Sequence, residues 1–371
     1  MLTLFYPYVI KLERIELFIS SKLVSGYLDN DIEVAEALAL ADALPVDVRS
    51  EDEYLADTIP GAVNIPILHN EERAAVGLTY RQEGEAAAFE LGLRLVAPQL
   101  EEKLRAAKNA ACGRSLAVFC WRGGKRSKEV ADFFSRAGLS VYRINGGYKA
   151  YRKHVLEFLE RKDLPLRGIV LHGLTGVGKT QALTELAQRG LPVLDLEGIA
   201  NHRGSVYGKI GLPPSPSQKA FESKIVALLK EAVPKGFFLV ECESRRIGNL
   251  LTPPMVLDFI RQGARILLYC SPEQRIKRIH EIYAGFTDEH VAALQEATAG
   301  LRRQLGRARV EELNNWLQGK EYDRVIAFML EHHYDPLYNY PAKPAAGYDL
   351  CVNTDDMAAA VDRIFRFATD S

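Results

Sequence analysis

The fold of the second half of the chain is decided by the stretch Gly173-Leu174-Thr175-Gly176-Val177-Gly178-Lys179-Thr180. This Gly-x-x-x-x-Gly-Lys-Thr pattern lies between an apolar run, Gly168 to His172, and a segment with helical spacing, Lys179 to Gln188. A buried strand, a glycine loop and a helix in this order are typical of a phosphate-binding loop (P-loop). The backbone N–H groups of such a loop and the N-terminus of its helix face an anion.

The residue types of the P-loop predict a diphosphate-type ligand without specifying a reaction. Glycines let the backbone curl round the anion without a Cβ clash. We expect Lys179 to reach the terminal phosphate and Thr180 to face Mg²⁺ where that ion accompanies the phosphates. The residues expected to bind the diphosphate are Gly173, Thr175, Gly176, Gly178, Lys179 and Thr180.

Acidic residues follow two further apolar runs, where a partner for the Lys-Thr pair is expected. Asp195 follows residues 192–194, and Glu241 and Glu243 follow residues 237–240. A solvated carboxylate at a strand end is the competing interpretation, and both stay open. We therefore predict no resident metal ion, and Mg²⁺ only as a companion of the phosphates.

A second loop of the same kind lies in the first half of the chain, between the apolar run 115–119 and a helical pattern that runs to Ala137. It begins at Cys120, and Ser127 is the expected N-cap of the helix. Converging N–H groups and neighbouring cations favour the thiolate of Cys120 over the thiol. We predict a catalytic nucleophile that attacks or carries a charged phosphorus or chalcogen atom. The predicted anion loop comprises Trp121, Arg122, Gly123, Gly124, Lys125, Arg126 and Ser127.

Two other interpretations of this cysteine stay open. Cys120 and Arg126 match the Cys-x₅-Arg loop of cysteine phosphatases, although Phe119 stands where those enzymes usually have histidine. A buried structural cysteine beside a solvated basic loop would have no chemistry. The other cysteines are interpreted as structural, because they lie in apolar segments or lack flanking cations: Cys112, Cys242, Cys270 and Cys351.

Length and composition set outer limits. The 371 residues exceed one ordinary domain and favour two. With 47 Lys and Arg against 48 Asp and Glu, the chain is not a protein that coats nucleic acid nonspecifically. Cysteines without a Cys-x-x-Cys pair argue against a disulfide framework and a zinc site. No apolar run approaches the roughly 20 residues of a membrane span, and no signal peptide is recognisable, so we expect a cytoplasmic protein.

Alternating strand and helix patterns predict an α/β fold with parallel sheets. We predict an N-terminal extension over residues 1–30, a first α/β domain over 31–160 and a P-loop domain over 161–371. A helical insertion is expected within the P-loop domain over residues 272–330. The stretch Arg161 to Pro165 is polar, ends in proline and is interpreted as the linker.

The first domain resembles the rhodanese family, through Asp47 to Ser50, Glu53-Tyr54 and Ile59 to Pro66. Cys120 falls at the position of that family's persulfide-carrying cysteine. A rhodanese domain ahead of a P-loop domain resembles the bacterial tRNA 2-selenouridine synthase family. Further segments similar to that family are residues 70–73, 76–77, 80–84, 120–127, 146–150, 195–198, 201–205, 241–248 and 334–336. Two departures are Cys242, where an acid is expected, and the first 30 or so residues, which have no counterpart.

This resemblance implies exchange of sulfur for selenium at the wobble 2-thiouridine of tRNA, through an S-geranylated intermediate. It implies two co-substrates and no bound cofactor: selenophosphate at the Cys120 loop, and geranyl diphosphate at the P-loop. tRNA would be the macromolecular partner, and an enzyme that produces selenophosphate is a possible second partner. Candidate substrate contacts are Gly84, His202 and Arg203.

A basic helical stretch supplies candidate tRNA contacts, because a few local ion pairs with phosphates suffice for binding. The candidates are Arg302, Arg303, Arg307 and Arg309, with Arg275, Lys277 and Arg278 upstream. The competing interpretation is an ordinary solvated helix face. Two other functions also stay open for the whole chain. One is a cysteine phosphatase or sulfurtransferase fused to a nucleotide-dependent P-loop kinase, and the other is a P-loop regulator with an inactive rhodanese module.

Overall fold

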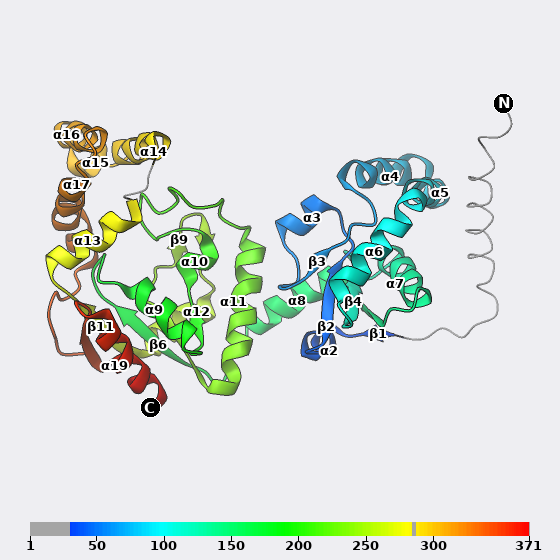
Figure 1. Ribbon diagram of the computed structural model, residues 1–371, viewed down its shortest axis with the longest axis horizontal. Helices are drawn as coiled ribbons and strands as arrows, with labels where there is room; N and C mark the ends of the chain where they lie inside the picture. Colours follow the sequence, from blue (N-terminus) through cyan, green and yellow to red (C-terminus); the bar gives the residue numbers. More distant parts are fainter. Residues whose placement is uncertain (1–29, 284–286, 371) are drawn as a thin grey trace.

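The structure of the protein is a computed structural model that describes residues 30–283 and 287–370 (Figure 1). The predicted N-terminal extension, apart from its last residue, lies outside the described residues. The described chain forms two parallel sheets, each covered by helices, as the predicted α/β fold requires. No helix among the described residues is long and apolar enough to cross a membrane.

The first sheet has the strand order β1-β5-β4-β2-β3, and all neighbours are parallel. Its strands are Asp31–Ile32 (β1), Ala43–Asp47 (β2), Val63–Asn64 (β3), Ser115–Phe119 (β4) and Val141–Ile144 (β5). Its helices are Val34–Ala39 (α2), Glu51–Ala56 (α3), Asn70–Glu83 (α4), Glu85–Val96 (α5), Leu100–Ala111 (α6), Lys125–Arg136 (α7) and Gly147–Leu159 (α8). The 3₁₀ turn Ala97–Gln99 (η2) joins α5 to α6.

Strand β4 lies in the middle of this sheet, and its side chains serve both faces. Leu116 and Val118 join one buried apolar cluster, whereas Ala117 and Phe119 join another. Alternation of this kind is what a strand with both faces covered requires. Cys120 therefore leaves the sheet from its most buried strand.

The second sheet has the order β12-β11-β6-β8-β7 and is also parallel throughout. Its strands are Arg167–His172 (β6), Val193–Leu194 (β7), Phe237–Glu241 (β8), Ala264–Tyr269 (β11) and Leu350–Asn353 (β12). Arg246–Ile247 (β9) and Leu250–Leu251 (β10) form a separate antiparallel pair. The helices beside the sheet are Lys179–Gln188 (α9), Leu196–Ala200 (α10), Gln218–Ala232 (α11), Pro254–Gln262 (α12) and Met357–Asp370 (α19), and the 3₁₀ turn Val233–Lys235 (η3) follows α11.

The helical insertion stands to one side of the second sheet (Figure 1). It comprises Pro272–Tyr283 (α13), Asp288–Ala299 (α14), Arg302–Leu305 (α15), Arg307–Gln318 (α16), Tyr322–Met329 (α17), the π-helical turn Leu330–Tyr334 (η4) and Asp335–Tyr338 (α18). Its buried side chains form an apolar cluster of their own. The predicted helical insertion is thus confirmed as part of the fold.

The two domains meet where α8 packs against α11. Tyr151 and Val155 of α8 share a buried cluster with Phe221 and Ile225 of α11. A polar contact lies within this interface: Tyr148 Oη donates to Asp57 Oδ2 at 2.6 Å, and Ser223 Oγ donates to the same oxygen at 3.3 Å. Burial raises the pKa of Asp57. Because apolar packing continues across the interface, the domains are joined by more than the linker.

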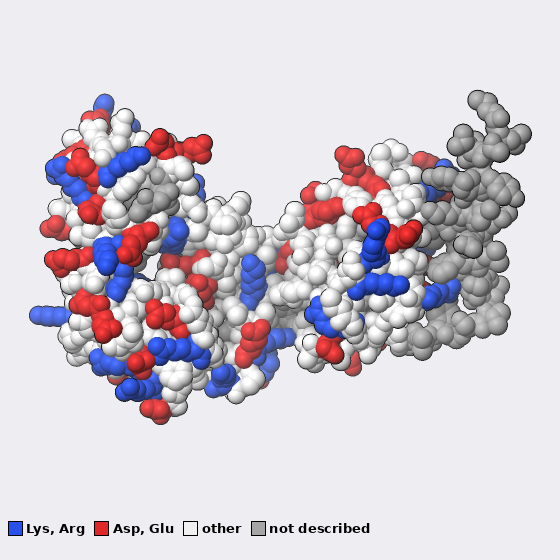
Figure 2. All heavy atoms as spheres, in the orientation of Figure 1, with Lys and Arg blue, Asp and Glu red and all other residues white. Residues whose placement is uncertain are grey.

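The surface carries both signs of charge side by side. Figure 2 shows Lys and Arg interspersed with Asp and Glu over both domains on the face in view, which agrees with the net charge of -1. Several surface pairs are neighbours on one helix, such as Arg307 with Glu311 and Lys153 with Glu157. Pairs of this kind contribute little to stability.

Candidate functional site

The P-loop lies between β6 and α9 and is held from behind by two arginines of α13. Arg275 Nε donates to the Thr175 carbonyl at 2.7 Å, and its other nitrogens donate to both oxygens of Asp335, at 2.9 and 2.5 Å. Arg278 donates to the Val177 carbonyl at 3.1 Å. These arginines were grouped with a basic surface in the sequence, but the structure uses them to brace the loop.

The start of the P-loop passes so close to its neighbour that only glycine fits. Gly173 has a φ of 142°, and a Cβ placed there would lie 2.4 Å from the Leu268 carbonyl oxygen of β11. At the other end of the loop, Lys179 Nζ donates to the Gly173 carbonyl at 3.1 Å. The ammonium group therefore spans the mouth of the loop, where an anion would bind.

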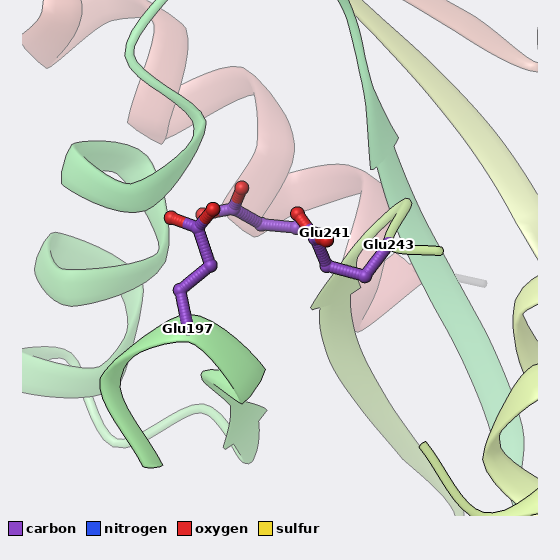
Figure 3. Close-up of side chains that lie close together, drawn as sticks. All are labelled: Glu197, Glu241 and Glu243. Carbon is purple, nitrogen blue, oxygen red and sulfur yellow. The ribbon is translucent and has the colours of Figure 1, made fainter. Parts of the chain in front are cut away.

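Three glutamates meet in front of the P-loop (Figure 3). Glu197 reaches from α10 toward Glu241 and Glu243 at the end of β8, and carboxylate oxygens of the three lie within 4.8 Å of one another. Thr180 Oγ1 donates to Glu241 Oε1 at 2.6 Å. Asp195 does not join this cluster: its Oδ1 accepts from the Gly198 N–H at 2.8 Å and caps α10.

Burial and mutual repulsion shift the titration of these carboxyls. Burial, and then repulsion from Glu241, raise the pKa of Glu197 to about 9 and that of Glu243 to about 7. The pKa of Glu241 is also raised by burial, against the opposing pull of Lys179. Burial and repulsion oppose simultaneous ionisation of the three carboxyls. Their oxygens are hard ligands, and this set fits a divalent cation such as Mg²⁺.

A cavity of about 610 Å³ opens from the P-loop and the glutamates into the helical insertion. Its charged end includes Lys179, Glu197 and Arg203. The insertion contributes apolar and aromatic side chains to the wall: Leu294, Leu317, Val325, Ile326, Met329 and Leu330, with Tyr322 and Tyr334. The wall also includes polar side chains: Gln181, Asn201, Ser205 and Glu281. The cavity therefore suits a ligand with a charged head and an apolar tail.

The three candidate substrate contacts are placed in three different ways. Arg203 lines the cavity and also donates to the Ile210 carbonyl at 3.0 Å. His202 is not among the lining residues, and its ring packs where a Cβ on Gly248 would lie. Gly84 joins α4 to α5 with a φ of 92°, in the first domain. Only Arg203 is thus placed to meet a ligand of the P-loop.

The Cys120 loop leads from β4 to α7. Cys120 is only 3% exposed, and its Sγ lies 3.2 Å from Ser127 Oγ. The helix begins at Lys125 rather than at the expected Ser127, whose Oγ instead donates to the Gly124 carbonyl at 3.1 Å. The N-cap prediction for Ser127 is therefore wrong, because this hydroxyl lies inside the first turn and faces the sulfur.

Helix α8 closes the back of this loop. The N–H of Tyr148 donates to the Cys120 carbonyl at 2.9 Å. Gly147 has a φ of 57°, and a Cβ there would lie 2.2 Å from that carbonyl oxygen. Trp121 packs on Tyr148 with ring centroids 5.2 Å apart, and the Arg49 guanidinium lies 4.1 Å from the Tyr148 ring centroid. Helix α8 therefore packs tightly against the Cys120 loop.

The cations of the Cys120 loop are partly neutralised. Lys125 forms an ion pair with Glu85, and Arg126 Nη1 lies 3.3 Å from Glu53 Oε2. Arg122 is exposed and has no ion-pair partner in the described part of the chain. The expected field of three unpaired cations is therefore reduced, and the backbone amides are the main anion donors left.

Comparison with known proteins gives the family. A family model described as the tRNA 2-selenouridine synthase AAA domain matches residues 166–364, and a rhodanese-like domain model matches residues 32–154. A curated tRNA 2-selenouridine synthase from Sulfurovum sp. (strain NBC37-1) is 30% identical over 325 residues, which cover 80% of this chain and 87% of that protein. The chain belongs to the tRNA 2-selenouridine synthase family. The resemblance found in the sequence and the predicted fold class are both confirmed.

One solved structure also matches part of this synthase-family chain. It is the N-terminal domain of a protein described as ATP/GTP-binding, from Clostridium difficile 630. The two are 37% identical, and the match covers 34% of this chain and 98% of the other, with a TM-score of 0.33. The low TM-score adds nothing to the fold assignment, which rests on the family models.

The arginines predicted to contact tRNA lie on α15 and α16 of this family member. Arg307 and Arg309 are engaged with Glu311 and Glu312, which lowers their capacity to bind a phosphate. Arg302 and Arg303 are exposed, and no ion pair involves them within residues 30–283 and 287–370. Arg302 and Arg303 on α15 are therefore better placed to bind a tRNA phosphate than Arg307 and Arg309 on α16.

Sequence reasoning missed Glu197 as a site residue. It stands two residues after Asp195, in a segment that marks the family resemblance, but the strand-end pattern selects only Asp195, Glu241 and Glu243 as candidate acids. The structure gives Asp195 the capping role and directs Glu197 to the cluster. An acid inside the first turn of a short helix was the available signal.

Proposed function

We propose that the protein is a tRNA 2-selenouridine synthase that replaces sulfur by selenium at wobble 2-thiouridine, through an S-geranyl intermediate. The observation that carries this proposal is the single cavity that joins a P-loop to an apolar chamber. A prenyl diphosphate needs a phosphate site and an apolar wall, and this cavity supplies both. Geranyl diphosphate has this combination of charged head and apolar tail.

The first step of the proposed reaction is prenyl transfer at the P-loop. The thiocarbonyl sulfur of the uridine attacks C1 of geranyl diphosphate and forms the C–S bond. The C1–O bond breaks, diphosphate leaves with the electron pair, and the N3 proton of the base is released to solvent. Lys179 and the P-loop amides stabilise the charge that grows on the leaving diphosphate, and Arg203 lies at the same end of the cavity.

The second step exchanges sulfur for selenium. Selenium from selenophosphate bonds to C2 of the base, and the C2–S bond breaks, because an alkylated sulfur leaves more readily than a thiocarbonyl. The Cys120 thiolate attacks phosphorus and breaks the P–Se bond, which releases the hydroselenide that bonds to C2. Geranylthiol departs with a proton, and water hydrolyses the S–P bond to give phosphate and the free thiolate. We assign selenophosphate to the amides of the loop after Cys120, with the Cys120 sulfur as the reactive group at its base.

Mg²⁺ would be held by the glutamate cluster together with Thr180. The donors are carboxylate and hydroxyl oxygens, the ligands that Mg²⁺ prefers. When bound, the ion would neutralise charge on the diphosphate. The chain's own contribution is to hold the three carboxylates near Lys179, because β7 pairs with β8 and α10 follows β7 directly.

Two variants test the proposal separately. Cys120→Ala should abolish 2-selenouridine while S-geranyl-2-thiouridine accumulates, and Lys179→Ala should abolish geranylation. Mass spectrometry of tRNA nucleosides, from cells that lack the gene and carry each variant, measures both products. Cys112→Ala and Lys224→Ala are matched controls on exposed positions and should behave as wild type.

Normal selenation by Cys120→Ala would remove the cysteine from the mechanism. Unchanged geranylation by Lys179→Ala would show that the P-loop binds another ligand. Release of phosphate from ATP or from an aryl phosphate, with no selenated product, would instead favour the kinase and phosphatase interpretations.

A further inference from the structure

The helices that line the cavity contact one another in a fixed order. Helix α13, which braces the P-loop through Arg275, packs against α17; α17 packs against α16, and α16 packs against α14. At the near end, Ile279 Cδ1 of α13 lies 2.9 Å from the place that a Cβ on Gly176 would occupy. Along this chain of contacts α16 and α14 are the helices farthest from α13, and each supplies one side chain to the cavity wall.

Helices α14 and α16 each contribute one leucine to the cavity wall. Leu294 of α14 is 4% exposed and Leu317 of α16 is 3% exposed. Both also belong to the apolar cluster of the insertion, so other side chains support them from behind. Helices α14 and α16 lie at the outer end of the insertion, away from the sheet that carries the P-loop (Figure 1).

We propose that Leu294 and Leu317 form the end wall that sets the length of the prenyl chain. This inference rests on the proposed function, because it concerns the donor of that same site. A chain longer by one isoprene unit would have to displace both leucines from a packed cluster, which overpacks the core. A shorter chain would leave the outer end of the cavity without contacts and lose apolar burial.

The same helix offers a matched control. Leu313 of α16 is fully buried in the same cluster, but it is not among the residues that line the cavity. Leu313→Ala and Leu317→Ala remove the same atoms from the same helix, and both lose core packing. Only Leu317→Ala should lengthen the chamber.

The experiment offers the full-length enzyme equal amounts of geranyl and farnesyl diphosphate with tRNA that contains 2-thiouridine. Mass spectrometry gives the ratio of farnesylated to geranylated nucleoside. Leu317→Ala and Leu294→Ala should each raise that ratio at least about tenfold over wild type, the scale on which apolar pockets discriminate by size. Leu313→Ala should leave it at the wild-type value. Because the ratio is internal, it does not depend on how much of a variant is folded.

Leu317→Phe tests the wall in the other direction and fills the chamber. It should shift use from geranyl toward dimethylallyl diphosphate in the same competition. Wild-type ratios in both Leu317 variants, or an equal change in Leu313→Ala, would overturn the end wall while leaving geranyl transfer intact. Absence of prenyl transfer from any donor by the wild-type enzyme would instead refute the proposed function.

Discussion

Replacing Glu243 by glutamine should stabilise the protein above pH 7 and remove part of the pH dependence of its stability. The pKa of Glu243 rises from 4.5 to about 7 in the folded chain, chiefly through burial and then through Glu241. The folded state therefore keeps this proton to a higher pH than the unfolded state does. Stability associated with the protonated carboxyl is complete below pH 4.5 and is lost as pH rises toward 7.

The size of this loss follows from the two pKa values. A change from 4.5 to about 7 at 1.36 kcal/mol per pH unit costs about 3 kcal/mol once the pH exceeds 7. Glu243→Gln cannot ionise and avoids this cost. At pH 8 the variant should therefore exceed wild type by up to about 3 kcal/mol in the free energy of unfolding, and at pH 4 the two should agree.

Urea unfolding of both proteins at pH 4, 6, 7 and 8, with and without excess Mg²⁺, measures the difference. A cation bound by the cluster takes the place of the proton, so Mg²⁺ should stabilise wild type at pH 8 and should narrow its gap to Glu243→Gln. Glu231→Gln, at an exposed position of α11, should follow the wild-type profile. Parallel pH profiles for wild type and Glu243→Gln would refute the raised pKa of Glu243. A stability difference between them that Mg²⁺ does not change would refute the cation site.

Three further perturbations test other contacts. Gly147→Ala forces a Cβ to within 2.2 Å of a loop carbonyl at positive φ, so we expect a loss of about 1–3 kcal/mol in thermal unfolding and no selenation. Arg275→Leu leaves Asp335 without its partner and frees the P-loop, so stability should fall by about 3 kcal/mol and prenyl diphosphate should bind more weakly by calorimetry. Reversing charge at both Arg302 and Arg303 should lower the salt dependence of tRNA binding by about one per lost phosphate contact, in filter binding, and an unchanged slope would place tRNA elsewhere.

Both anion loops could be predicted because each is a continuous stretch whose residue types answer a local need. Glycine is required where amides converge, and the structure places Gly123 and Gly173 against backbone atoms that admit no Cβ. The strands that carry the loops were equally predictable, since a central parallel strand such as β4 is apolar on both faces. The confirmed α/β fold followed from these local patterns.

The glutamate cluster could not be predicted in the same way, because it is assembled by packing. Glu197 lies near Glu241 only because β7 pairs with β8 and α10 follows β7 directly. The role of Arg275 was hidden for a similar reason: an arginine on a helix has the same spacing whether it faces water or a loop carbonyl. Long helices such as α11 were missing from the sequence prediction, although α11 forms half of the domain interface.

The two anion loops share one construction and differ in what closes them. Each leaves a central strand of a parallel sheet and enters a helix N-terminus, which is a general solution for binding an anion. Behind the Cys120 loop, α8 packs so tightly that even one Cβ is excluded. Beyond the P-loop, the insertion leaves an apolar cavity of about 610 Å³, and the anion bound there can carry a long chain. A reaction that uses one compact charged donor and one prenyl donor requires two sites that differ in this way. The difference arises from α8 and from the helical insertion, not from the two loops themselves.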